Sequence, residues 1–296
     1  MDLILTAAAA APAIVLMAYI YRKDGIEHEP IRLLLALFLG GCVSVVPVMV
    51  CELFADSLLL SMFGDSVTYI FMENFFGVAL IEEGWKLIFL IAIAWKSKHF
   101  DYLFDGIVYA VFVSLGFALV ENILYVTGEG SFGDGLALAG SRALLSVPLH
   151  CFCGVFMGFF FGQAKDAKIN GDKSAYKHAK VMTITVPVAI HGFYDFCLSM
   201  DSELLIIVFF IFVVAIYVYA FKRVAASAKE DRAFRAAVPS ESPVEVWPPQ
   251  SMMNQYVAPA PQATASSTNW YCPNCGSSNS TSYCPNCGTP RPIMPH

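Results

Sequence analysis

Ionisable side chains interrupt four long apolar stretches of the sequence, at positions where a hydrocarbon environment would penalise them. The stretches read IEEGWK, FALVENILY, SVPLHCF and HGFYDF around these residues. An ionisable side chain at the centre of a bilayer costs about 2.5–3.5 kcal/mol on insertion scales, so each one is a candidate for function. The polar residues of these stretches are Glu82, Glu83, Lys86, Glu121, Asn122, His150, His191 and Asp195.

Helix spacing predicts which of these side chains can meet. Lys86 lies one turn from both Glu82 and Glu83, so it can neutralise one carboxylate on its own helix. The other carboxylate then needs a partner on another helix, or a proton. His191 and Asp195 also lie one turn apart, so the carboxylate can orient the imidazole.

Buried acids beside histidines support three kinds of chemistry. They can relay protons, or a carboxylate can act as a general base on a water molecule. Two histidines and a glutamate can also hold a metal with one open position for water. The stretches contain no convincing serine or cysteine nucleophile beside a base. Each of these residues, taken alone, also has a structural interpretation. Glu121 and Asp195, for example, lie near span ends, where their carboxylates can reach the lipid headgroups.

The remaining polar residues have structural interpretations as well. Lys86 with Glu83 can be a structural ion pair, and His191 can be a packed histidine. Asn122 and Arg142 are interpreted as supporting residues. These interpretations do not explain why acids and histidines recur on four consecutive apolar stretches.

The composition fixes the fold class. Hydrophobic residues make up 57% of the chain and charged residues 14%, whereas soluble domains carry about 25% charged residues. A large soluble all-α core is therefore disfavoured, and we expect an all-α polytopic membrane protein with about seven transmembrane helices. The first apolar run has no basic leader or clear cleavage site, which favours a span over a signal peptide. The expected spans are 3–21, 33–53, 70–95, 103–126, 142–163, 181–199 and 204–221.

The basic residues predict the orientation. Every Lys and Arg except Lys86 and Arg142 falls in alternate connections or in the C-terminal tail. The intervening loops 54–69, 127–141 and 200–203 contain acids but no basic residue. The positive-inside rule therefore places the N-terminus outside and the C-terminus in the cytoplasm, in a multi-pass protein of the cytoplasmic membrane.

This orientation puts the polar residues of all four spans in the outer half of the bilayer. His150 and His191 lie about eight residues, or roughly 12 Å, from the expected outer ends of their spans. Gly154 and Gly158 follow His150 at steps of one turn, so this face can approach another helix closely.

The chain divides into a membrane domain at 1–221, a connecting segment at 222–268 and a short terminal module at 269–290. Residues 222–237 are expected to continue the last span as a short basic helix. The Pro-, Ala- and Ser-rich stretch that follows is typical of a flexible linker.

The terminal module contains two CPNC pairs, each followed by a glycine. Four thiolates at this spacing predict a closed, structural zinc ribbon, because so short a segment cannot fold on a core alone. Disulfides are the alternative, and the expected cytosolic location disfavours them. The segment resembles the short zinc ribbons appended to many prokaryotic membrane proteins, which implies contact with a cytosolic protein or a nucleic acid. The ligands are Cys272, Cys275, Cys284 and Cys287.

The motifs of the membrane domain also resemble those of a known family. EExxK at 82–86, FxxxE at 117–121 followed by Asn122, His150 after Arg142, and HGxYD at 191–195 are similar to the motif set of PrsW-type intramembrane proteases. That family is distantly related to the CAAX prenyl endopeptidases. The resemblance covers about residues 70–200, the expected active core, and excludes the zinc ribbon.

The resemblance implies hydrolysis of membrane-anchored proteins, such as anti-sigma-factor-like regulators, near the outer face of the membrane. Glu82 or Glu83 is then expected to be the general base. His150 and His191 would position the water or stabilise the oxyanion, with Asp195 orienting His191. Glu121 is a second acid or a ligand. A metal-independent scheme is slightly favoured over a catalytic Zn²⁺, because the sequence lacks HExxH.

Two other function classes compete with the protease. One is a proton-coupled transporter or channel, which the lack of an evident inverted repeat disfavours. The other is a non-catalytic membrane scaffold or sensor in which the zinc ribbon does the binding. The intact acids and histidines at every motif argue against the scaffold.

Overall fold

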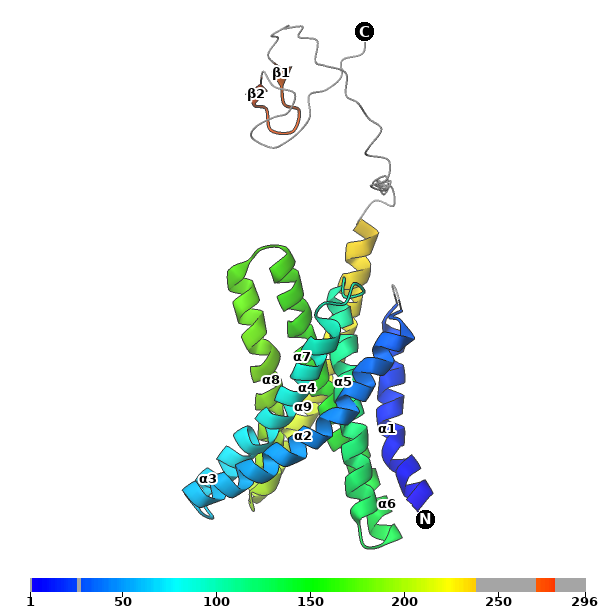
Figure 1. Cartoon of the computed structure of the whole chain (residues 1–296), viewed down its shortest axis with the longest axis vertical. Coiled ribbons are helices and arrows are strands. Elements are labelled where there is room, and N and C mark those ends of the chain that lie inside the picture. Colours follow the sequence, from blue (N-terminus) through cyan, green and yellow to red (C-terminus); the bar gives the residue numbers. More distant parts are fainter. Residues whose placement is uncertain (1, 26–27, 238–269, 280–296) are drawn as a thin grey trace, which may run out of the picture. The chain divides into compact units, whose positions relative to one another are not determined.

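The computed structural model describes residues 2–25, 28–237 and 270–279, and the chain separates into two units at residue 240 (Figure 1). The first unit is entirely helical in its described part. Its elements are α1 (Asp2–Lys23), α2 (Ile31–Phe63), α3 (Val67–Met72), η1 (Glu73–Ala79), α4 (Leu80–Ala94), α5 (Leu103–Gly128), α6 (Phe132–Leu144), α7 (Ser146–Ile169), α8 (Lys173–Ser199) and α9 (Glu203–Ala237).

Six helical stretches of this unit are long and apolar enough to cross a membrane. They agree with six of the expected spans and confirm a polytopic, nearly all-helical membrane protein. The six stretches are Leu3–Lys23, Ile31–Phe63, Leu103–Gly128, Phe132–Ile169, Lys173–Ser199 and Glu203–Asp231.

The expected third span is segmented. Residues 67–94 form α3, a π-helical segment η1, and α4 in unbroken succession. Ser66 accepts a hydrogen bond from the Tyr69 N–H at the start, and Asn74 donates to the Ile70 carbonyl within η1. π-Helical segments are rare and frequently occur at functional sites. This one directly precedes the paired glutamates of α4.

A loop was expected at 127–141, but most of this segment belongs to helix α6. The expectation of a loop is therefore wrong from Phe132 onward. Ser131 accepts a hydrogen bond from the Asp134 N–H and begins the helix. Gly135 then packs against Leu5 and the Val126 carbonyl, which buries this face of α6. The five glycines between 128 and 140 are typical of a loop, but one of them, Gly135, allows close packing instead.

Helix α5 is the centre of the unit and is enclosed by α1, α2 and α7 (Figure 1). Its residues are apolar on all faces, as expected for a helix without a solvent-facing side. The first turn is fixed by two carboxylates. Asp105 accepts from the Asp101 and Tyr102 N–H groups, and Asp231 of α9 accepts from the Phe104 N–H at 2.8 Å.

Glycines allow the backbones of α5 and α7 to approach closely. A Cβ atom on Gly158 would lie 2.2 Å from the Gly106 carbonyl oxygen, and one on Gly154 would lie 2.9 Å from Ser114 Oγ. The close-approach face expected for Gly154 and Gly158 is therefore confirmed. It matters for the site because α7 carries His150 one turn earlier.

Gly158→Ala is expected to destabilise the membrane unit by about 1–3 kcal/mol, since the new methyl group would overlap backbone rather than a flexible side chain. Gly140→Ala is the matched control, because a Cβ there meets nothing within 4 Å. The thermal unfolding midpoint of each variant in detergent measures the difference. Equal midpoints for the two variants would contradict the close approach.

The second unit is described from 270 to 279 only. Strand β1 (Trp270–Tyr271) pairs antiparallel with β2 (Ser278–Asn279), with Trp270 opposite Asn279. Between them the Cys272 N–H donates to the Ser277 carbonyl at 2.9 Å, and Gly276 adopts a φ of 72°. The expected ligands Cys284 and Cys287 lie outside the described residues, as does the expected linker.

Candidate active site

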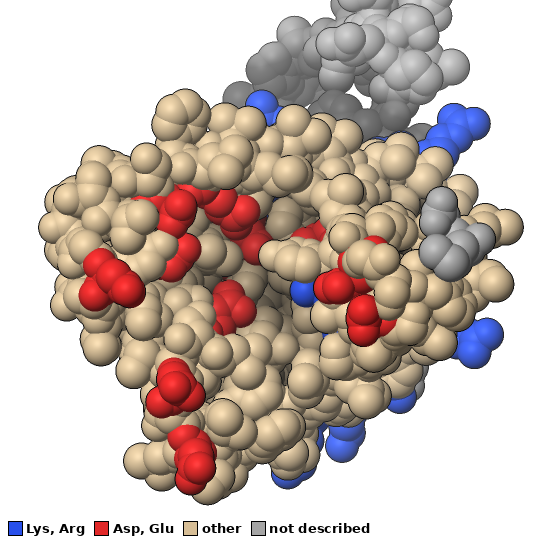
Figure 2. Space-filling view, turned by 90° about the horizontal axis from the view of Figure 1, so that it is seen from below, with Lys and Arg blue, Asp and Glu red and all other residues tan. Residues whose placement is uncertain are grey.

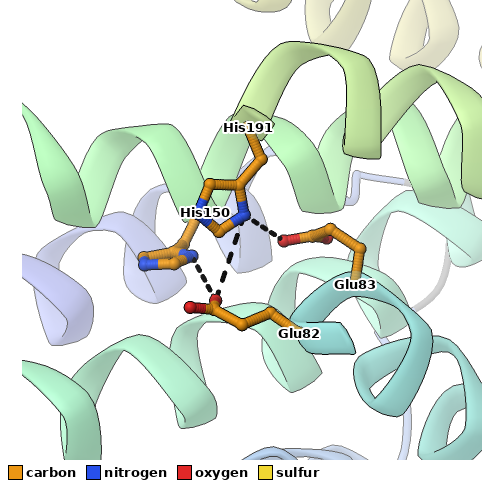
Figure 3. A group of neighbouring side chains, drawn as sticks. All are labelled: Glu82, Glu83, His150 and His191. Atoms are coloured by element: carbon orange, nitrogen blue, oxygen red, sulfur yellow. Dashed lines mark hydrogen bonds and ion pairs between the residues drawn. The ribbon is translucent and has the colours of Figure 1, made fainter. Parts of the chain in front are cut away.

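Four buried side chains from three helices converge in the membrane unit (Figure 3). Glu82 and Glu83 come from α4, His150 from α7 and His191 from α8. One ligand atom from each residue lies within 4.8 Å of those from the other three. The residues expected to share a depth on separate spans therefore meet at one point.

Lys86 lies against this cluster and is fully buried. Its Nζ atom donates to Glu82 Oε2 at 2.9 Å, to Glu83 Oε1 at 2.8 Å and to His150 Nδ1 at 3.0 Å. The ammonium also lies 4.1 Å from the centre of the Phe117 ring. The sequence predicted that Lys86 neutralises one carboxylate, whereas it contacts both and a histidine of another helix.

His191 is fixed by a carboxylate at each ring nitrogen. Its Nδ1 lies 3.0 Å from Glu83 Oε1, and its Nε2 lies 3.1 Å from Asp195 Oδ2. The predicted pairing of His191 with Asp195 is therefore present. Glu82 Oε2 lies 3.9 Å from the Nδ1 atoms of both His191 and His150.

The tautomer of His150 follows from its partners. An ammonium has only donors, so Lys86 requires His150 Nδ1 to accept its hydrogen bond. The proton of a neutral ring is then on Nε2, which lies 3.0 Å from Glu121 Oε2 and donates to it. Two opposite partners hold the imidazole in one orientation.

Arg142 extends the network outward from Glu121. It donates to Glu121 Oε2 and to Asn122 Oδ1, each at 2.7 Å, and its guanidinium lies over the Tyr125 ring. Asn122 in turn donates to the Ala9 carbonyl at 2.7 Å, which ties α5 to α1. All nine site residues predicted in the membrane domain thus belong to one connected network.

A cavity of about 750 Å³ opens beside the cluster. Glu82, His150 and His191 line it, whereas Glu83 and Lys86 are not among its lining residues. Figure 2 shows the hollowed face of the unit, with carboxylates gathered around the hollow and most of the visible basic side chains at the periphery. The two adjacent glutamates therefore differ, because only Glu82 faces the cavity.

One cavity carboxylate was not among the predicted site residues. Glu52 lies on α2 and lines the same cavity as Glu82 and Glu121. Its place at the end of an apolar run is typical of a boundary residue, so the sequence did not single it out. A signal was present, because Glu52 follows Val45, Val48 and Met49 at helical spacing.

The donor set fits a divalent metal. Two carboxylates and two imidazoles are ligands that Zn²⁺ accepts, and Glu83 Oε2 is buried without a hydrogen bond in the described part of the chain. The Lys86 ammonium already contacts three of these four side chains, so a metal would compete with it for them. The same residues thus offer a site for either cation.

The comparisons with known proteins decide the family. Residues 29–221 match the family described as PrsW family intramembrane metalloprotease. The chain belongs to the PrsW family. It is similar to the Protease PrsW of Bacillus subtilis, with 37% identity over 196 residues that cover 66% of this chain and 83% of that protein.

Other PrsW proteases give the same picture. The chain is 36% identical over 220 residues to Protease PrsW of Oceanobacillus iheyensis, covering 73% of this chain and 94% of that protein. It is 31% identical over 209 residues to Protease PrsW of Clostridioides difficile, covering 71% of this chain and 85% of that protein. No solved structure matches the chain.

This PrsW-family chain is an intramembrane endopeptidase and a multi-pass protein of the cytoplasmic membrane. The resemblance drawn from the motifs is therefore confirmed. The transporter and the scaffold are set aside, because the matching relatives are proteases. The matched region contains all nine site residues of the membrane unit and ends before the tail.

Proposed function

We propose that peptide bonds of membrane-anchored proteins are cleaved in the 750 Å³ cavity, with Glu82 as the general base. The observation that carries the proposal is that Glu82 lines this cavity beside two fixed histidines, whereas Glu83 is buried behind them. Glu82 takes a proton from a water as its oxygen attacks the scissile carbonyl. The proton then passes to the leaving amine as the C–N bond breaks.

The other residues position the reacting groups. Glu83 and Asp195 orient His191, while Lys86 and Glu121 orient His150. Both ring nitrogens of each imidazole are engaged by these partners, so a histidine stabilises the oxyanion of the tetrahedral intermediate by exchanging one of these hydrogen bonds for the substrate oxygen. Arg142 holds Glu121 in place and is itself held by Asn122. The contacts of the network support each of these roles.

Glu83, His150 and His191 are the residues that would hold a catalytic Zn²⁺. Such an ion would lower the pKa of a bound water and polarise the substrate carbonyl. Glu82, the carboxylate of the adjacent pair that faces the cavity, keeps its role as proton acceptor in this version.

We place seven crossings in the membrane, with the segmented helix 67–94 as the third. The N-terminus is then outside and the C-terminus in the cytoplasm, because the basic residues lie in alternate connections. The cavity consequently opens toward the outer face. Substrates are single-span proteins with a cleavable segment there, of which anti-sigma-factor-like regulators are an example.

The experiment that tests the assignment is cleavage of a single-span reporter by the purified chain in liposomes, with Glu82→Gln as the comparison. Fragments that map to the outer half of the reporter's span support it. Fragments from the inner half only, or equal cleavage by the two proteins, would argue against it.

We also propose that the tail forms a structural zinc ribbon that binds a cytosolic protein or a nucleic acid. The turn after Cys272 supports this, because the Gly276 N–H donates to the Cys272 carbonyl and Gly276 has a positive φ. Such a turn brings the two sulfurs of a CxxC pair toward one point. Cys284 and Cys287 supply the other two ligands.

Replacing these four cysteines by serine is expected to lower the zinc content of the purified chain by one equivalent. Serine carries a hydroxyl group that cannot replace the thiolate ligand of zinc, so the tetrahedral site is lost. Elemental analysis against protein concentration measures the change. Replacing Cys42 and Cys51 by serine is the control, and a loss of zinc from that variant would place the ion elsewhere.

A further inference from the structure

Glu52 lies on a face of α2 that forms one wall of the catalytic cavity. Val45, Val48, Met49 and Glu52 all line the cavity, at the spacing that places them on one side of a helix. From Val45 to Glu52 the helix rises about 10 Å. An extended peptide covers that length with about three residues. The wall is therefore apolar along Val45, Val48 and Met49, and it is acidic at Glu52, at the end that lies toward α3.

Glu52 differs from the other carboxylates of the cavity in having no partner. Glu82 is paired with Lys86, Glu121 with Arg142 and Asp195 with His191. Within residues 2–25 and 28–237, no hydrogen bond or ion pair is formed by Glu52. Arg142, the one Lys or Arg among the lining residues, is already held by Glu121 and Asn122.

The charges around Glu52 make a cation favourable there. Glu82 and Glu121 act on it as like charges, while Lys86 and His191 act as opposite charges. A half-buried carboxylate without a partner loses hydration that no protein group replaces. A basic side chain brought by the substrate would supply the missing partner and would form a charge-assisted hydrogen bond.

We propose that Glu52 is a specificity-determining residue that binds a Lys or Arg side chain of the substrate near the scissile bond. The preferred substrates are membrane-anchored proteins whose apolar segment ends in a basic residue. Apolar side chains contact Val45, Val48 and Met49, and the basic side chain, about three residues away, reaches Glu52. This inference rests on the proposed cleavage in the cavity.

The test uses three single-span reporters that differ only in the residue at the outer border of the apolar segment, which is Lys, Gln or Glu. They are cleaved in liposomes by the wild-type chain, Glu52→Gln and Glu52→Lys. Wild type is expected to cleave the Lys reporter about ten-fold faster than the Glu reporter, the size of one charge-assisted contact. Glu52→Gln is expected to bring this ratio near one, and Glu52→Lys to invert it.

The ratio between reporters is informative even where a variant is less active overall. Asp65→Lys makes the same charge change on an exposed residue after α2 and is expected to keep the wild-type ranking. A wild-type ratio that persists in both Glu52 variants overturns the inference. An equal loss of cleavage rate on all three reporters overturns it as well, because Glu52 would then act in the hydrolysis step and not in the choice of substrate. If wild type cleaves no reporter, the cleavage assignment fails and the inference fails with it.

Discussion

Glu82→Gln is expected to lower the rate of reporter cleavage by about 10²- to 10⁴-fold, the range of general-base catalysis. Glutamine keeps the size of the side chain and can still accept a hydrogen bond from Lys86, but it cannot take a proton from water. The fold should persist, because Lys86 retains the second carboxylate, Glu83, at 2.8 Å. Cleavage is measured in liposomes, and folding by the thermal midpoint.

Two variants control this result. Glu129→Gln removes an exposed carboxylate and is expected to keep full activity. Glu83→Gln disturbs the pairs with both His191 and Lys86, so it should reduce activity and also lower the thermal midpoint. If Glu83→Gln abolished cleavage while Glu82→Gln retained it, the two glutamates would exchange roles.

Local spacing made the paired residues of the site predictable. Glu82 and Lys86, and likewise His191 and Asp195, meet on their own helices because one helical turn separates them. Apolar runs of limited length then fixed the depth of each helix, since the bilayer leaves little freedom to shift them. These two constraints were enough to predict that the four central side chains lie at a similar depth.

Contacts between helices were not predictable in the same way. Lys86 reaches His150, and Arg142 reaches Glu121, because of the rotation of helices about their axes, which packing sets. The segmented third span depends on a π-helical segment that no periodicity indicates. Glu52 was missed because its helical spacing with Val45, Val48 and Met49 is typical of any amphipathic helix, and only the packed structure shows that this face lines the cavity.

Lys86→Met is expected to destabilise the membrane unit by about 3–5 kcal/mol and to stop cleavage, because it leaves Glu82 and Glu83 buried without a cation. For a unit of this size the loss corresponds to about 6–20 °C in the thermal midpoint. Lys98→Met is the matched control, since Lys98 is exposed at the end of the same membrane segment. A wild-type midpoint for Lys86→Met would show that the ammonium is not required for the fold.

The same variant tests whether the ammonium and a metal compete for one position. Lys86 contacts three of the four side chains that a metal would use, so its removal leaves two carboxylates and two imidazoles open to a divalent ion. In a background lacking the four tail cysteines, added Zn²⁺ should raise the midpoint of Lys86→Met more than that of the chain with Lys86. Equal shifts would mean that the metal and the ammonium can be bound together. The ammonium would then belong to the metal-bound enzyme as well, as the group that balances the second carboxylate.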